Sequence, residues 1–179
     1  MNIGFDLDKI FINFPPLIPP KVIDLLYKEK TKQGLKYRIP SRIERSLRIL
    51  SHHPFLRSPI TKNLDFLKKN LSTGKNNYYL ISSRFDFLKD RTDDLIKRYD
   101  LDRIFKAMYF NYLNKQPHEF KNEILEKLKL DMYADDDLQL LEYLADKNPR
   151  TKFFWLNDKI NKILKKNIFA IKHISEMFK

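Results

Sequence analysis

Three short apolar stretches in this chain are each followed at once by acidic or hydroxyl residues. Stretches of this length, separated by segments of helical periodicity, predict βαβ units and a mostly parallel sheet. Right-handed crossovers bring the carboxyl ends of parallel strands to one edge, so we expect the polar residues to gather there. The stretches and their polar ends are 3–5 with Asp6 and Asp8, 78–81 with Ser82 and Ser83, and 132–134 with Asp135 and Asp136.

The remaining periodicity predicts an α/β fold in which strands and helices alternate along the chain. One helix is marked especially clearly, because Ser41 and Glu44 form a capping box at its start. Its apolar residues Ile43, Leu47 and Leu50 are expected to face inward, and Arg42, Arg45 and Arg48 outward. The predicted strands are 2–8, 77–81, 105–110, 130–134 and 152–156, and the predicted helices are 21–33, 42–51, 60–71, 87–99, 120–128, 138–146 and 158–166.

A proline cluster after the first strand predicts that the sheet is interrupted by an insertion. Pro15, Pro16, Pro19 and Pro20 cannot continue a central strand. We therefore predict a small helical cap over 15–60, with residues 1–14 and 61–179 forming the core. Residues 15–76 hold +10 of the net charge of +12, so the cap is expected to be basic. Clustered charge beside a cleft focuses its field on an anionic ligand.

Composition excludes several classes of site. At 179 residues with 42% hydrophobic content, the chain can bury one core. The absence of cysteine excludes disulfides, thiolate catalysis and cysteine-based zinc sites, and it suits a reducing compartment. Three glycines do not suffice for a phosphate-binding P-loop or a dinucleotide motif. The chain shows neither a secretory signal nor an apolar run of the roughly 20 residues that span a bilayer, so we expect a cytoplasmic protein without a membrane role.

Four segments of the chain resemble, in order, the four short motifs of the haloacid dehalogenase-like superfamily of phosphatases. They are 5–8, 80–83, Lys121 and 133–136. The resemblance covers the whole predicted core and implies a Rossmann-like three-layer sandwich with the 15–60 insert as its cap. It also implies a small phosphorylated substrate and a magnesium ion as cofactor. Lys9 departs from the pattern, since a small residue commonly follows the second aspartate.

The resemblance assigns a role to each motif residue. Asp6 would attack phosphorus and form an aspartyl-phosphate, and Asp8 would act as general acid and base, which requires a raised pKa. Ser82 would donate a hydrogen bond to the phosphoryl group, and Lys121 would offset its charge. The Asp6 carboxylate, the Asp8 carbonyl and Asp136 would hold Mg²⁺, with Asp135 as a further candidate ligand. Lys115 is the alternative to Lys121.

Substrate contacts are expected from the second motif and from the insert. Ser83 and Arg84 directly follow Ser82, and the basic insert offers Arg42 and Arg45, with Arg38 as a further candidate. Nucleotides, sugar phosphates and phosphoproteins all remain open as substrates.

Two other functions compete with a phosphatase that acts on a small metabolite. The first is a nucleic-acid-binding or scaffold protein without turnover that uses the basic segment 15–76, where Tyr27, Tyr37 and Phe55 would stack on bases. The second is a phosphatase that acts on nucleotides or on a nucleic-acid end. A response-regulator receiver is excluded, because its acid pair precedes a phosphoacceptor on a middle strand.

Overall fold

The structure, a computed structural model, describes residues 1–15, 28–29, 35–71, 74–157 and 164–179. Strands and helices alternate through the core, as the periodicity predicts. The strands are β1 (Asn2–Phe5), β2 (Lys28–Glu29), β3 (Lys36–Tyr37), β4 (Asn77–Ser82), β5 (Ala107–Phe110), β6 (Met132–Asp135), β7 (Lys152–Leu156) and β8 (Ile168–Ile171). The α-helices are α2 (Arg42–Ser51), α3 (Thr61–Leu71), α4 (Lys89–Arg98), α5 (Pro117–Leu128) and α6 (Leu138–Lys147). Short 3₁₀ helices cover Pro54–Leu56, Asp86–Leu88, Leu101–Arg103 and Ile174–Phe178.

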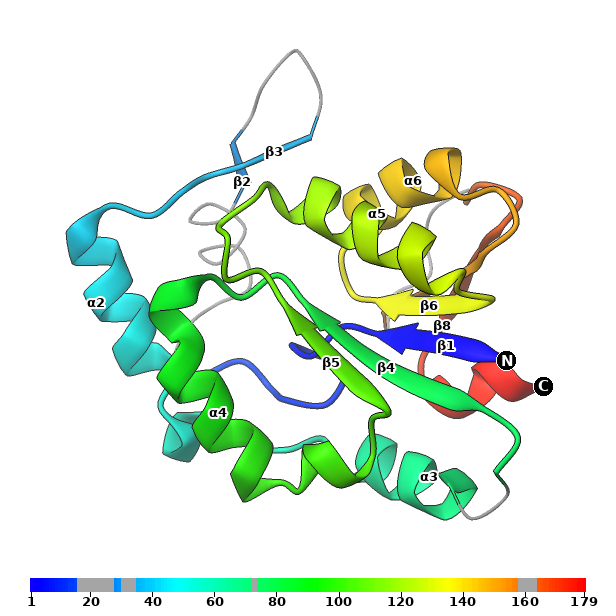
Figure 1. The fold of residues 1–179 in the computed structure, drawn as a ribbon, viewed down its shortest axis with the longest axis horizontal. Helices are drawn as coiled ribbons and strands as arrows, with labels where there is room; N and C mark the ends of the chain where they lie inside the picture. Colours follow the sequence, from blue (N-terminus) through cyan, green and yellow to red (C-terminus); the bar gives the residue numbers. More distant parts are fainter. Residues whose placement is uncertain (16–27, 30–34, 72–73, 158–163) are drawn as a thin grey trace.

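Six strands form one parallel sheet in the order β5-β4-β1-β6-β7-β8. The first strand lies in the middle, with Phe5 in register with Leu80 of β4 on one side and with Ala134 of β6 on the other. Because all three strands run in the same direction, their carboxyl ends meet at one edge (Figure 1). The predicted convergence of polar strand ends is therefore confirmed.

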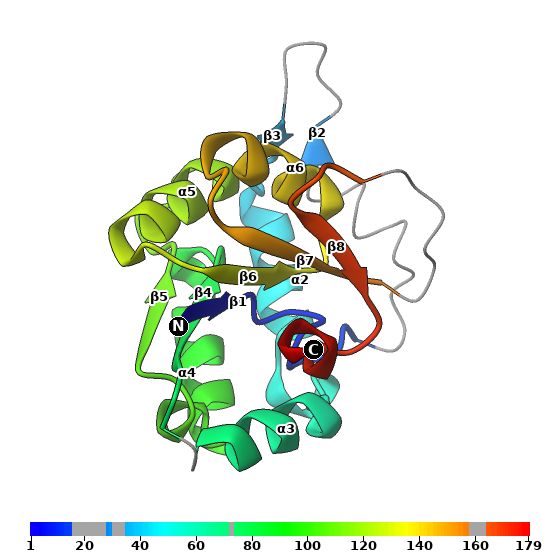
Figure 2. The ribbon, with the colours of Figure 1, turned by 90° about the vertical axis from the view of Figure 1, so that its right-hand side faces the viewer.

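Helices cover both faces of this sheet and create two apolar cores. On one face, α3, α4 and the C-terminal 3₁₀ helix pack on side chains that include Ile3 and Leu80. On the other, α5 and α6 pack on Ile81 and Tyr133 (Figures 1 and 2). Gly4 faces this second layer closely, since a Cβ there would lie 2.5 Å from a Leu130 methyl group. The three-layer α/β sandwich expected from the sequence is confirmed.

The two ends of the predicted insert lie side by side. The backbone N–H of Asn13 donates to the Ser58 carbonyl at 2.9 Å, and that of Ile60 donates to the Phe11 carbonyl at 2.7 Å. Between these ends lie the antiparallel pair β2–β3 and helix α2 (Figure 1). The boundaries of a separate cap at 15 and 60 stay a prediction.

Helix α2 has the predicted bounds and the predicted capping box, and Arg42 and Arg45 are exposed as predicted, but its apolar residues and Arg48 do not face as predicted. Ile43, Leu47 and Leu50 are exposed, whereas Arg48 is buried. At the end of α2, the buried His52 ring accepts a hydrogen bond from Arg57, which in turn pairs with Asp8. The apolar side chains of α2 therefore do not pack into either apolar core among the described residues.

Two other sequence predictions need correction or lie outside the described residues. The predicted helix 21–33 lies largely outside them, but Lys28–Glu29 is strand β2, which pairs with β3. Most of the predicted helix 158–166 also lies outside them. The chain then forms β8, an edge strand that the sequence analysis missed. No helix in the described ranges is long and apolar enough to cross a membrane.

Candidate active site

The polar residues of the candidate site come from the ends of three adjacent strands and from one helix. Asp6 follows β1 directly, and its N–H donates to the Ala134 carbonyl of β6 at 2.9 Å. Ser82 and Asp135 are the last residues of β4 and β6. Lys121 projects from the second turn of α5. All four residues are buried, so a polar cluster lies inside the protein.

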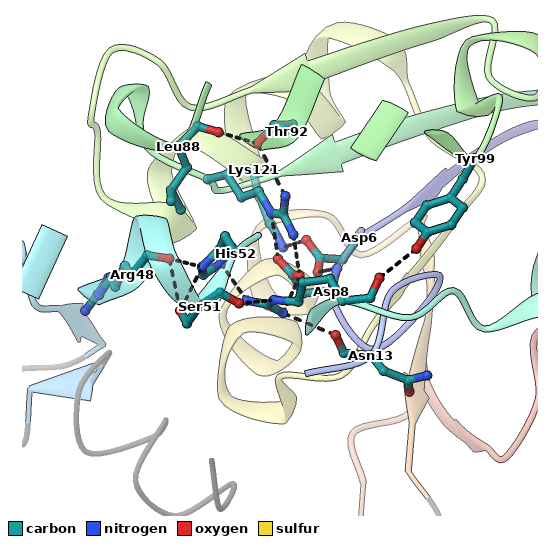
Figure 3. A network of polar contacts seen from close by, with 12 residues as sticks. Asp6, Asp8, Asn13, Arg48, Ser51, His52, Leu88, Thr92, Tyr99 and Lys121 are labelled. Carbon is teal, nitrogen blue, oxygen red and sulfur yellow. Dashed lines mark hydrogen bonds and ion pairs between the residues drawn. The ribbon is translucent and has the colours of Figure 1, made fainter. Parts of the chain in front are cut away.

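The Lys121 ammonium bridges two of the acids. Its Nζ lies 2.8 Å from Asp6 Oδ1 and 2.7 Å from Asp135 Oδ2 (Figure 3 shows Asp6 and Lys121). Burial disfavours the charged amine, but Asp135 and Asp6 outweigh burial and hold the pKa of Lys121 well above its usual value. Lys115, the alternative, instead pairs with Glu123 at 2.7 Å on the surface. Of the two lysines, Lys121 reaches the acidic cluster.

Three carboxylates form a set that fits a hard divalent cation. Asp6, Asp135 and Asp136 each offer a ligand oxygen, and these atoms lie within 4.8 Å of one another. Carboxylate oxygens are the ligands that Mg²⁺ prefers. Burial raises the pKa of Asp6 to about 8, against the opposing effect of Lys121. Burial, with Asp135 beside it, likewise raises the pKa of Asp136 to about 6, although Lys9 opposes this.

Asp137 lies outside this set. Its Oδ1 accepts hydrogen bonds from the N–H groups of Gln139 and Leu140, which makes it the N-cap of α6. Its Oδ2 accepts a bond from the Tyr37 hydroxyl at 2.8 Å. Asp137 therefore serves the start of α6.

The surroundings of Asp8 favour its ionised form, whereas its predicted role as general acid requires a raised pKa. Arg84 donates to both its carboxylate oxygens, at 2.8 and 3.0 Å, and Arg57 donates to Oδ1 at 3.1 Å (Figure 3 labels Asp8). Burial alone would raise the pKa of Asp8, but the two guanidinium groups hold it well below its usual value. The expectation of a raised pKa is therefore wrong for this arrangement, because two buried cations stabilise the carboxylate.

Arg57 belongs to the site, and the sequence analysis missed it. Its Nη2 donates to His52 Nε2 at 2.6 Å, so His52 Nδ1 carries the proton and donates to the Arg48 carbonyl at 2.7 Å. Burial, together with Arg57, lowers the pKa of His52, which keeps the ring neutral. No pattern marks Arg57 in the sequence; only the folding of the insert onto the core brings it to Asp8.

The predicted substrate-binding residues fall into two groups. Ser83 and Arg84 lie next to the site, and the Ser83 hydroxyl is buried without a hydrogen-bond partner among the described residues. Two of the three candidate arginines of the insert make local contacts instead. Arg45 donates to the Pro40 carbonyl, Arg38 pairs with Glu44, and Arg42 is exposed at the start of the helix. Contacts of these three side chains with substrate stay a prediction.

The aromatic residues of the nucleic-acid hypothesis differ in their exposure. Tyr27 lies outside the described residues. Tyr37 is buried and bonded to Asp137, so its ring is not free to stack on a base. Phe55 is exposed, with the Arg98 guanidinium 4.7 Å from its ring centre. Stacking by a row of aromatic residues is therefore less favoured than the sequence suggests.

Comparison with known proteins rests on structure. No protein-family model matches the chain. No curated protein matches its sequence either. A protein from Thermotoga maritima provisionally assigned as a β-phosphoglucomutase superposes with a TM-score of 0.62 and 16% identity, over 98% of this chain and 95% of that one. A haloacid dehalogenase-like hydrolase from Streptococcus pneumoniae gives a TM-score of 0.61 and 11% identity, over 99% and 96%.

A third similar structure was determined with ligands bound. It is an enzyme of the same family from Bacteroides thetaiotaomicron, in complex with magnesium and inorganic phosphate. Its TM-score is 0.57 at 14% identity, over 89% of this chain and 95% of that one. At these identities the similarity shows a shared fold. The fold expected from the four motifs, that of haloacid dehalogenase-like enzymes, is therefore confirmed.

Proposed function

We propose that the protein is a magnesium-dependent phosphatase that hydrolyses a phosphate monoester through an aspartyl-phosphate on Asp6. The observation that carries the proposal is the bridge from Lys121 to Asp6 and Asp135 at the ends of adjacent strands. A carboxylate nucleophile that attacks a phosphate dianion needs nearby cations to offset the repulsion. Lys121 supplies one of them, and Asp6, Asp135 and Asp136 would hold Mg²⁺ as the other.

The chain's own residues account for binding and attack. Asp6 Oδ2 accepts a hydrogen bond from the Asp8 N–H at 3.0 Å, which fixes the orientation of the carboxylate. The Ser83 hydroxyl is a buried donor available to a phosphoryl oxygen, and Ser82 would provide a second. When bound, the metal would withdraw charge from the phosphoryl group and favour the ionised form of Asp6.

Proton transfer to the leaving group depends on Asp8, which the arginines hold ionised in this structure. Asp8 can donate a proton only after at least one guanidinium contact breaks. A substrate with an acidic leaving group needs no such proton. An aryl phosphate is therefore the appropriate first substrate, since a phenolate departs without protonation.

The experiment measures hydrolysis of an aryl phosphate by the wild type, Asp6→Asn and Asp146→Asn, each with and without Mg²⁺. Asp146 is an exposed acid on α6 and serves as the matched control. We expect magnesium-dependent turnover in the wild type and the control, and a loss of at least about 10³-fold in Asp6→Asn. Turnover that survives in Asp6→Asn would refute the covalent mechanism.

The substrate is proposed to be a nucleotide or another small phosphorylated metabolite. Residues 15–76 carry most of the excess positive charge, which favours an anionic ligand beside the site. A screen of phosphorylated metabolites with the active wild type would identify it. Substrate affinity that falls steeply with salt only for oligonucleotides would favour a nucleic-acid end instead.

A further inference from the structure

Lys9 holds one of the acids that would bind the metal. Its Nζ lies 2.8 Å from Asp136 Oδ2, and the ammonium also lies 4.7 Å from the ring centre of Phe14. The backbone of Lys9 is in the left-handed region, with φ of 60°, directly after Asp8. From this backbone position the lysine side chain reaches the acidic cluster.

The two lysines of the cluster differ in their freedom to move. The side chain of Lys121 is 3% exposed, so it is fixed between Asp6 and Asp135. The side chain of Lys9 is 40% exposed, so its four-carbon stem can swing into solvent at little cost. The cluster therefore contains one permanent cation and one that can leave.

An ammonium and a divalent cation compete for the same carboxylate. A metal ligated by Asp136 would lie within a few ångströms of the Lys9 ammonium, where two positive charges repel each other. The carboxylate would also have to exchange a hydrogen bond for a metal–oxygen bond. In this geometry Lys9 opposes the cation that the three acids attract.

We propose that Lys9 is an internal competitor of the divalent cation: its ammonium occupies Asp136 in the metal-free protein and is displaced when the cation binds. This inference rests on the metal site of the proposed function. Lys9 thereby weakens Mg²⁺ binding and sets the concentration at which the site fills.

Calorimetric titration of the metal-free proteins with Mg²⁺, without substrate, tests this directly. Lys9→Gly and Lys9→Asn remove the charge, and both replacements accept a left-handed backbone. Agreement between them excludes ligation by the new asparagine amide. Lys9→Arg keeps the charge. Lys165→Asn is the matched control, because Lys165 is also 40% exposed and pairs with an acid, Asp146, on α6.

We expect both neutral variants to bind Mg²⁺ about fivefold more tightly than the wild type. In these variants the metal no longer has to break the partly exposed ion pair between Lys9 and Asp136. Lys9→Arg and Lys165→Asn should match the wild type. Equal affinities in all five proteins would overturn the role of Lys9 while leaving the metal site intact. Absence of Mg²⁺ binding in the wild type and in both neutral variants would overturn the metal site itself, and the role of Lys9 with it.

Discussion

Both carboxylate oxygens of Asp8 accept hydrogen bonds from the guanidinium group of Arg84, Oδ2 from Nε at 3.0 Å and Oδ1 from Nη2 at 2.8 Å. Arg57 adds a third donor from a different segment of the chain. Asp8 therefore joins the loop after β1, the loop after β4 and the segment that precedes α3. A residue predicted for proton transfer has an additional structural role, with consequences that can be measured.

Replacing Asp8 by asparagine should destabilise the protein strongly. Asp8→Asn leaves the buried guanidinium groups of Arg57 and Arg84 without the carboxylate that they share, and breaking a buried ion pair costs about 3–5 kcal/mol. Chemical denaturation measures the free energy of unfolding. The exposed Asp146→Asn, which breaks the pair with Lys165, should cost about 1 kcal/mol or less. Equal effects of the two substitutions would contradict the structural role.

The stabilisation by Asp8 should depend on pH in one direction. Its pKa in the folded protein lies below the usual 3.8, so folding favours the ionised form. Its contribution is then fully present above pH 3.8 and is lost as the pH falls below that value. The gap in unfolding free energy between the wild type and Asp8→Asn should shrink when denaturation is repeated at increasingly acidic pH. A gap that widens on acidification would disprove the assignment.

Removing the Lys121 charge should make the protein depend more on magnesium. In Lys121→Met, Asp6 and Asp135 lose the ammonium that bridges them inside the protein. Buried carboxylates repel each other unless a cation lies between them, so Mg²⁺ should raise the melting temperature of this variant more than that of the wild type. Thermal unfolding with and without Mg²⁺ gives both increments. Lys115→Met, at the surface pair with Glu123, should retain the wild-type increment.

Magnesium affinity should rise with pH. Metal binding requires ionised carboxylates, and burial raises the pKa of Asp136 to about 6 and that of Asp6 to about 8 in the metal-free protein. Protons therefore compete with the metal at low pH, and binding should release protons. Calorimetry between about pH 5 and pH 8, in buffers of different ionisation enthalpy, measures both effects. Affinity that stays constant over this range would contradict the raised pKa values.

A methyl group at Gly4 should disturb the packing of β1. A Cβ there would lie 2.5 Å from Leu130 Cδ1 and 2.9 Å from Tyr133 Cδ2, both in buried side chains. We expect Gly4→Ala to lower the unfolding free energy by about 1–3 kcal/mol. Gly74→Ala has open space around the new methyl group and should cost only the strain of a positive φ, about 1 kcal/mol. Denaturation curves of the two variants separate crowding from backbone strain.

The candidate site was largely predictable because its residues follow a local rule. Asp6, Ser82 and Asp135 each end a strand, and parallel strands of one sheet bring such ends together. The resemblance of four segments, in order, to the four motifs of one enzyme superfamily then identified Lys121, which lies on α5. Short-range patterns also defined α2, since the Ser41–Glu44 capping box involves residues three apart.

Periodicity and near-neighbour patterns were enough to predict the alternation of strands and helices, the gathering of polar strand ends at one edge of the sheet and the capping of α2. The charge state of Asp8, the burial of Arg57 and the outward apolar face of α2 follow instead from how the chain folds. These depend on contacts between distant segments, such as Asp8 with Arg57 and Arg84. A pKa or a buried face is set by the partners and the solvent exclusion around a group, and only folding brings these together.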